Sequence, residues 1–391
     1  MDMHELQAVI ADCGLDGWLF CDFHNRDPIA YRILGLDFGR FTSRRWFYFV
    51  PARGEPVCLQ SRVEPARLDP LPGERRFYLS MAELEEQLGR LVKGLRVAMQ
   101  YSPGHAIPAV STVDAGMVEL VRAAGAKVVS SADLVQRLDA VIDRAGYESH
   151  MEAGRRLHRV KDDAFTLIHD ALRDGRCLSE YDVQRFILRR YEEEGLDCKG
   201  EEPIVGVNDH PADPHFLPTP ENARQIRPGD TILIDMWACL AKPRAIFHDI
   251  TWCGFAGVTP PAEYVRIFEV VRDARDAAIA FAARRLQAGE PCAGFEVDDA
   301  CRAVVRAAGY GDAFIHRTGH SIGVEVHGNG VNIDNLETHD ERRLVPGICF
   351  SVEPGIYLPG RMAARSEVDV FVHEGGRVEV TGPAQRELVL V

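Results

Sequence analysis

The chain has 391 residues, of which 46% are hydrophobic, and its formal net charge is −14 at pH 7. This length suggests two domains, and the acidic balance argues against a general nucleic-acid-binding surface. No apolar run approaches the roughly 20 residues that span a bilayer, and the N-terminal residues lack the basic and apolar regions of a signal peptide. The ten cysteines are scattered, as in proteins that keep reduced thiols. We therefore expect a cytoplasmic protein that binds neither nucleic acid nor membranes.

Strands alternate with helices in the first part of the chain, which predicts an α/β domain. Ser80 and Glu83 have the spacing of a capping box at the start of a helix. This part carries no dense cluster of His, Asp and Glu with ligand character. A boundary is expected near residues 140–147, so the predicted domains are 1–143 and 144–391. The predicted helices are 3–13, 80–92 and 112–124, and the predicted strands are 17–22, 46–50, 56–59, 96–101 and 127–129.

Two helix pairs, each attached to strands, are predicted in the second part, which indicates an internally duplicated α+β layout. Ser179 caps the second helix, Asp182 occupies its N3 position, and Gly195 ends it. The predicted helices are 148–174, 179–194, 260–287 and 295–308. The predicted strands are 203–206, 231–238 and 245–255, followed by a strand-rich end.

Histidines and carboxylates recur in the apolar, β-rich segments of this second part. Asp and Glu are rarely buried unless they are paired or bind a metal, and carboxylates with imidazole are ligands for divalent cations. The structural alternatives are aspartates that cap turns at strand ends and exposed strand glutamates. The candidate ligands, in chain order, are Asp235, Asp249, His320, Glu353 and Glu367.

This ordered set, with His215 and His327 in their local sequences, resembles the metallopeptidase family of methionine aminopeptidase, aminopeptidase P, prolidase and creatinase. The resemblance covers roughly residues 147–391 and extends more weakly over the N-terminal half. It implies a C-terminal "pita-bread" catalytic domain, an N-terminal creatinase-like α/β domain and assembly as a homodimer. It also implies that the five ligands hold two divalent metal ions.

The resemblance assigns a role to each further candidate. Glu353 would be both a ligand and the acid/base that takes a proton from the attacking water. His327 would lie near the substrate amide, and His215 would help the leaving nitrogen or the tetrahedral intermediate. His316 and Arg365 would line the substrate pocket. A purely structural role is the alternative for each histidine. Oxygen ligands with one imidazole suit Mn²⁺, with Co²⁺, Zn²⁺ and Fe²⁺ as alternatives.

Three features depart from the family pattern. Asp235 and Asp249 are 14 positions apart, which is more than is usual in the family, so we expect a longer hairpin loop between them. Val368 follows Glu367 where the family usually has an acid. Dipeptidases of the family bind the substrate carboxylate with a basic residue that cannot be matched to one position here. Arg342 and Arg343 are the candidates, and surface arginines are the alternative. Cys239, Cys253 and Cys349 are predicted to be small core residues.

These observations predict a metallo-exopeptidase that cleaves Xaa-Pro bonds in small peptides through a metal-bridging hydroxide. It would be a prolidase-like dipeptidase or an aminopeptidase P-like enzyme. A metal-dependent lyase of the dimethylsulfoniopropionate type, or another small-molecule hydrolase, would keep the same ligands. A metal-free creatinase-type hydrolase or an inactive peptide-binding homologue would lose some of them.

Overall fold

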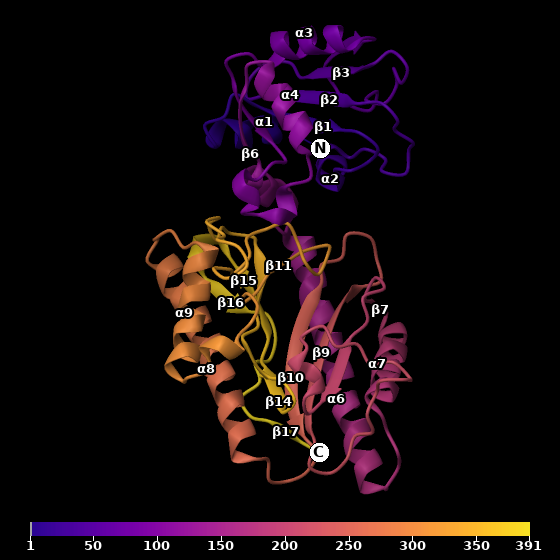
Figure 1. Ribbon diagram of the computed structural model, residues 1–391, viewed down its shortest axis with the longest axis vertical. Coiled ribbons are helices and arrows are strands. Elements are labelled where there is room, and N and C mark those ends of the chain that lie inside the picture. Colours follow the sequence, from indigo (N-terminus) through magenta and orange to yellow (C-terminus); the bar gives the residue numbers. More distant parts are fainter. Residues whose placement is uncertain (1) are drawn as a thin grey trace. The chain divides into compact units, whose positions relative to one another are not determined.

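The computed structural model describes residues 2–391 and divides into two compact units (Figure 1). The first unit ends at Asp139 and the second is Ala140–Val391. No helix within residues 2–391 combines the length and the apolar composition that a membrane-crossing segment requires.

The first unit is built on a six-stranded mixed sheet with the order β4-β3-β2-β1-β5-β6. The strands β1 to β3 pair antiparallel, whereas β4, β5 and β6 join by parallel pairing. The strands are β1 (Gly17–Asp22), β2 (Trp46–Pro51), β3 (Val57–Ser61), β4 (Glu74–Tyr78), β5 (Arg96–Met99) and β6 (Lys127–Ser130). The helices are α1 (Met3–Asp12), α2 (Pro28–Leu34), α3 (Met81–Val92), α4 (Ala115–Ala123) and α5 (Ala132–Val135).

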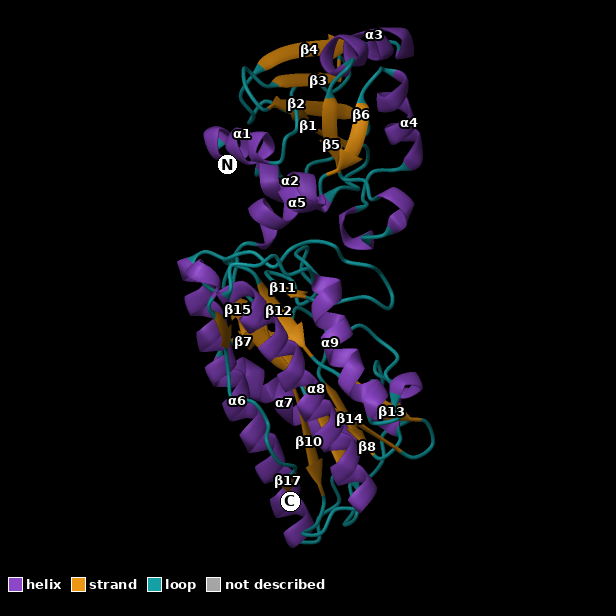
Figure 2. Cartoon of the chain, turned by 90° about the vertical axis from the view of Figure 1, so that its left-hand side faces the viewer, coloured by secondary structure: helices purple, strands orange, loops and turns teal. Residues whose placement is uncertain are grey.

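Both faces of this sheet are buried, because successive side chains of a strand point to opposite faces. In β1, Trp18 and Phe20 join the core that includes α1 and α2. Leu19 and Cys21 join the core on the other face with α3 and α4. Figure 2 shows α1 on one side of the sheet and α3 and α4 on the other. Helices on both faces explain why β1 reads as a continuous apolar run.

The second unit begins with the helix pair α6 (Arg144–Arg173) and α7 (Glu180–Glu194), which packs on a sheet of the order β17-β10-β9-β7, with β8 also paired to β9. Ser179 and Asp182 form the predicted capping box, and Gly195 ends α7 with a positive φ of 64°. The strands are β7 (Leu196–Asp197), β8 (Ile204–Val207), β9 (Thr231–Leu240), β10 (His248–Phe255) and β17 (Val389–Leu390).

The second helix pair, α8 (Ala262–Gln287) and α9 (Gly294–Ala307), packs on the remaining strands of this unit. These strands form a sheet of the order β11-β12-β15-β16 and the hairpin β13-β14. Figure 1 shows the two helix pairs flanking the strands. The strands are β11 (Ser321–Ile322), β12 (Cys349–Val352), β13 (Gly355–Leu358), β14 (Met362–Arg365), β15 (Val368–Val372) and β16 (Val378–Val380).

The long predicted helices agree with the structure, including the helix expected at 148–174, which is α6. Several short elements were not predicted, among them α2, β4, α5 and β7. Helix α2 has only seven residues, and its signals are the Asp27 cap and Pro28 at its start. Strand β4 has the polar sequence ERRFY because it is a sheet edge with mostly accessible side chains. Cys239, Cys253 and Cys349 are buried, as predicted.

Candidate active site

The two candidate aspartates lie on neighbouring strands of an antiparallel hairpin. Asp235 in β9 is opposite Thr251 in β10, and Asp249 is opposite Trp237. Residues opposite each other in a sheet share a face, and so do residues two apart along a strand. The register therefore places both aspartates on the same face, next to the hydroxyl of Thr251. The extra residues between them form the turn after Leu240, so the hairpin keeps this pairing.

Backbone hydrogen bonds bring the other three candidate ligands to this face. The Glu353 N–H donates to Thr318 O at 2.7 Å, which holds the end of β12 against the segment that carries His320. The Glu367 N–H donates to Thr251 O at 3.3 Å and links the approach to β15 with β10. Gly319 allows the close approach, because a Cβ there would lie 1.9 Å from Ser351 O. The position before His320 therefore requires glycine.

The ligand atoms of these residues converge. His320 Nε2 lies 3.3 Å from Glu353 Oε1 and 3.7 Å from Asp249 Oδ2. Ligand atoms of Asp249, His320 and Glu367 all lie within 4.8 Å of one another, and all three residues are buried. Such spacings suit a cation coordinated at about 2.0–2.2 Å from each donor.

The buried carboxylates lie close enough to repel one another, and a bound cation would offset this repulsion. Burial, followed by the charges of Asp235 and Asp369, raises the pKa of Asp249 well above its usual range. Burial and the charge of Asp249 do the same to the pKa of Glu367. Asp249 Oδ1 and Glu367 Oε1 are buried without a hydrogen-bond partner among the described residues. Unpartnered oxygens next to an imidazole are the donor set that divalent cations prefer, so these residues fit a metal centre.

Asp235 has a different environment from the other acids. Its Oδ1 accepts a hydrogen bond from the Thr251 hydroxyl at 2.8 Å, and its Oδ2 accepts one from the Arg365 guanidinium. Arg365 also donates to Thr251 Oγ1 at 3.0 Å and to the Tyr357 hydroxyl at 3.2 Å. Arg365 lines the cavity, but its guanidinium is engaged by Asp235, Thr251 and Tyr357 rather than free for a substrate.

All the predicted site residues line one cavity of about 410 Å³. That volume suits a small ligand. The His327 ring lies 4.3 Å from the His320 ring, measured between centroids. His316 Nδ1 lies 2.6 Å from Arg317 O and must donate to it, so His316 Nε2 accepts from the Tyr357 hydroxyl at 2.6 Å. The nine residues are Asp235, Asp249, His320, Glu353, Glu367, His215, His316, His327 and Arg365.

Sequence reasoning missed the cation best placed to meet a substrate. Arg317 lines the cavity, and its side chain has no hydrogen bond or ion pair within residues 2–391. Its charge reaches the site: burial is the main cause of the lowered pKa of His327, and the Arg317 charge lowers that pKa further. Burial raises the pKa of Glu353, and Arg317 opposes this with a smaller effect than Arg365. The available signal was its position in the motif, between His316 and Thr318.

Two of the family departures have structural explanations. Arg342 is not a surface residue: it is buried, pairs with Asp340 through two nitrogens and donates to Asn329 O at 2.7 Å. Val368 is a buried core residue at the start of β15. The acid expected at that point is one position later, where Asp369 Oδ2 accepts the Asp249 N–H at 2.8 Å.

Two helix pairs flanking strands, with a carboxylate–imidazole set among the strands, define a metallohydrolase of the pita-bread class. Residues 152–374 match metallopeptidase family M24. The chain is 30% identical over 275 residues to the probable dipeptidase PepE of Mycobacterium tuberculosis, covering 70% of this chain and 67% of that protein. It is 32% identical over 215 residues to the Xaa-Pro dipeptidase of Lactobacillus helveticus, covering 53% and 51% respectively.

The fold agrees with these similarities. The crystal structure of a dipeptidase from Pyrococcus horikoshii OT3 matches with a TM-score of 0.66 and 26% identity, over 100% of both chains. The chain belongs to metallopeptidase family M24. The predicted family, the pita-bread fold and the metallo-exopeptidase class are therefore confirmed.

Proposed function

We propose that this protein hydrolyses Xaa-Pro dipeptides with two divalent cations, Mn²⁺ being the favoured metal. The observation that carries the proposal is the convergence of Asp249, His320, Glu353 and Glu367 in one cavity with three further histidines. The Xaa-Pro dipeptidase of Lactobacillus helveticus and the probable dipeptidase PepE support this substrate class. When bound, the cations would offset the charge of the carboxylates, polarise the scissile carbonyl and acidify a water.

Glu353 is the proposed proton acceptor. Its pKa is raised to about 7 by burial, against the lowering effect of Arg365, and the charge of Asp235 raises it further. That pKa belongs to the metal-free site, and bound cations would favour the ionised carboxylate, which is the form that accepts a proton. Ser351 Oγ donates to Glu353 Oε1 at 3.2 Å and fixes the carboxylate orientation. Glu353 can thus take the proton from the attacking water and pass it to the leaving nitrogen.

The histidines suit a proline substrate. An imide bond before proline has no N–H, so a site that depends on that donor rejects it. His215 and His327 line the cavity and can donate toward the substrate amide and the leaving nitrogen. The His316–Tyr357 hydrogen bond fixes the wall beside Arg365. In this proposal, His316 shapes the pocket for the proline ring.

Arg317 is the proposed contact for the C-terminal carboxylate of a dipeptide. It is a cavity cation with no partner within the described residues, whereas Arg365 is engaged by Asp235 and Arg342 by Asp340. A guanidinium matches a carboxylate geometrically and electrostatically. A longer peptide would present an uncharged amide at this point, so Arg317 favours dipeptides. Assembly as a homodimer and a cytoplasmic location belong to the same proposal through the family resemblance.

The test is a comparison of kcat/KM for Xaa-Pro, Xaa-Pro-Xaa and Xaa-Ala under the same Mn²⁺ loading. The proposal predicts the highest value for Xaa-Pro. Equal cleavage of Xaa-Ala would reject the proline specificity, and equal cleavage of Xaa-Pro-Xaa would reject the dipeptide restriction. If no peptide turns over while the cations are bound, a non-peptide reaction on this scaffold replaces the proposal.

A further inference from the structure

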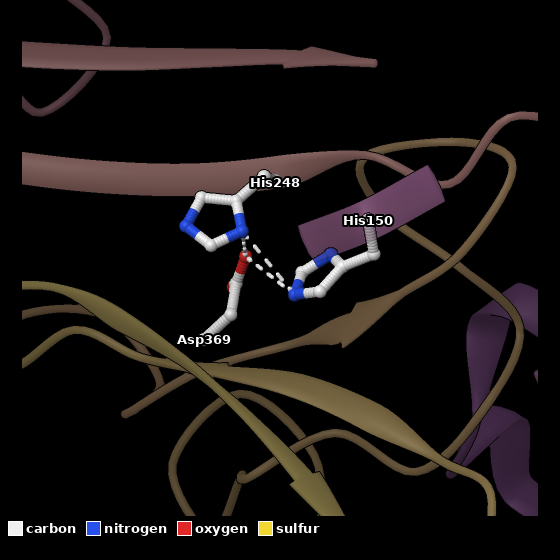
Figure 3. Close-up of side chains that lie close together, drawn as sticks. All are labelled: His150, His248 and Asp369. Carbon is white, nitrogen blue, oxygen red and sulfur yellow. Dashed lines mark hydrogen bonds and ion pairs between the residues drawn. The ribbon is translucent and has the colours of Figure 1, made fainter. Parts of the chain in front are cut away.

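A second group of ligand-type side chains lies outside the cavity, in the core of the second unit. His150 from α6, His248 from the start of β10 and Asp369 from β15 point toward one another (Figure 3). All three are buried, with no more than 1% of any residue exposed. None of them lines the active-site cavity. The proposed peptidase chemistry gives no role to the two histidines.

The distances within this group suit a tetrahedral cation site. His248 Nδ1 lies 3.2 Å from His150 Nε2 and 3.7 Å from Asp369 Oδ2, and His150 Nε2 lies 4.0 Å from the same oxygen. Ligands about 2.0–2.2 Å from a tetrahedral zinc ion are roughly 3.3–3.6 Å apart. Small side-chain shifts would therefore place the three atoms around one ion.

The tautomer of His150 is the one that a metal ligand needs. His150 Nδ1 lies 2.5 Å from Phe247 O, and a carbonyl can only accept, so Nδ1 carries the proton. His150 Nε2 therefore presents a lone pair to the group. Metal-bound histidines commonly donate their other N–H to a backbone carbonyl in this way. The Thr381 hydroxyl now donates to His150 Nε2 at 2.7 Å, and it has Asp369 O at 3.3 Å as another acceptor.

A sulfur atom lies beside this group of three ligand atoms, next to His150. Cys349 Sγ lies 3.8 Å from His150 Nε2, and Cys349 is a free, buried thiol. Two imidazoles, one carboxylate and one thiolate are zinc-type ligands, and their two negative charges would neutralise a divalent cation. That neutrality matters, because Asp369 forms no ion pair with a Lys or Arg within the described residues, and its Oδ1 has no hydrogen-bond partner.

The surrounding backbone is shaped to hold the His248 ring. A Cβ at Gly154 of α6 would lie 2.5 Å from the His248 ring, so only glycine lets the helix approach this closely. His248 Nε2 is buried without a partner among the described residues. A cation held through His248 Nδ1 would leave the ring proton on Nε2, so Nδ1 is the ligand atom that this ring offers to the group.

We propose that His150, His248, Asp369 and Cys349 form a structural site for one Zn²⁺ ion, separate from the catalytic cations. The ion would join α6, β10, β12 and β15 in the core. The site also contacts the active site, because Asp369 Oδ2 accepts the N–H of Asp249. A zinc ion here would thus fix the strand that carries a catalytic ligand.

The experiment uses metal-free full-length protein loaded with Co²⁺ as a spectroscopic substitute for Zn²⁺. The nine predicted active-site residues contain no sulfur, so a thiolate-to-cobalt charge-transfer band does not come from that set, and its loss in Cys349→Ser assigns it to the second site rather than to another free cysteine. We expect the band in the wild type and its loss in Cys349→Ser and His150→Gln. Cys253→Ser and His158→Gln are matched controls, buried like the residues tested, and should keep it. Absence of the band in the wild type, which needs no variant to fold, would overturn the proposal.

Zinc content provides a second readout that does not depend on activity. In an Asp235→Asn/Glu367→Gln background, which disables the catalytic set, we expect about one Zn²⁺ per chain to be retained. Adding His150→Gln should remove that ion. Retention of zinc in the triple variant, or its complete loss in the double variant, would contradict a separate site.

Discussion

Arg365 donates a hydrogen bond to the carboxylate of Asp235, and both side chains are buried and line the cavity. Removing one member of a buried ion pair leaves the other charge uncompensated, which costs about 3–5 kcal/mol. We predict that Arg365→Gln lowers the free energy of unfolding of the metal-free protein by about 3 kcal/mol. Urea unfolding in chelator measures this. Arg317→Gln, which breaks no ion pair, is the control and should unfold like the wild type.

Arg317 should act on the substrate instead of on stability. We predict that Arg317→Gln lowers kcat/KM for an Xaa-Pro dipeptide by roughly 10- to 100-fold, mainly through KM, because a charge-assisted hydrogen bond of about 1.5–3 kcal/mol is lost. The Xaa-Pro amide, which lacks the carboxylate, should be affected far less. Arg343→Gln serves as the comparison. An equal loss on the dipeptide and its amide would exclude Arg317 as the carboxylate contact.

The two outer histidines should affect turnover without affecting the metals. His215→Ala and His327→Ala are expected to lower kcat by about 10²–10⁴-fold, the range for lost general acid–base catalysis. Bound Mn²⁺ should stay at the wild-type level, because neither residue belongs to the converging ligand set. Steady-state kinetics and metal analysis of the same preparations measure both effects. Full activity of either variant would show that its histidine has no catalytic role.

The raised pKa of Glu353 should make the stability of the metal-free protein depend on pH. Its folded pKa of about 7 lies above the usual 4.5. Between these values the folded carboxyl keeps a proton that the unfolded chain has released, so the free energy of unfolding falls as pH rises from about 4.5 to about 7. The fall is on the order of 3 kcal/mol relative to Glu353→Gln. The comparison with Glu353→Gln is needed because burial lowers the pKa of His316 to about 3. This lowered pKa makes the free energy of unfolding rise with pH over part of the same range.

Chelated samples of both proteins should be unfolded at several pH values across this range. A constant difference between the wild type and Glu353→Gln would contradict the raised pKa. Adding Mn²⁺ should abolish the pH-dependent difference, because a cation favours the ionised carboxylate.

The sequence predicted the elements with strong local signals. The apolar runs around Asp235 and Asp249 predict the β9–β10 hairpin, and the pairing of Asp235 with Thr251 follows from it. The long helices follow from their periodicity and caps. Strand β4 was missed because its side chains are polar, as expected of an edge strand.

The residues of the active site and of the proposed second metal site that were not predicted from the sequence depend on tertiary contacts. His150 lies 98 positions before His248 and looks like one polar residue in a long helix. Only the packing of α6 against β10 and β15 places these side chains together. Arg317 lies in the sequence motif between His316 and Thr318, but only the fold shows that its side chain forms no ion pair with the described residues. Arg342 was considered as a carboxylate contact or a surface residue, but in the fold it is buried and forms an ion pair with Asp340.

The most direct test of the account measures bound Mn²⁺ and Xaa-Pro turnover together in the wild type, Asp249→Asn, Glu367→Gln and an exposed control, Glu193→Gln. We predict about two Mn²⁺ per chain in the wild type and the control, as two-metal catalysis requires. Each ligand variant should lose at least one ion and most of its turnover. Unchanged metal content and unchanged turnover in both ligand variants would contradict the account.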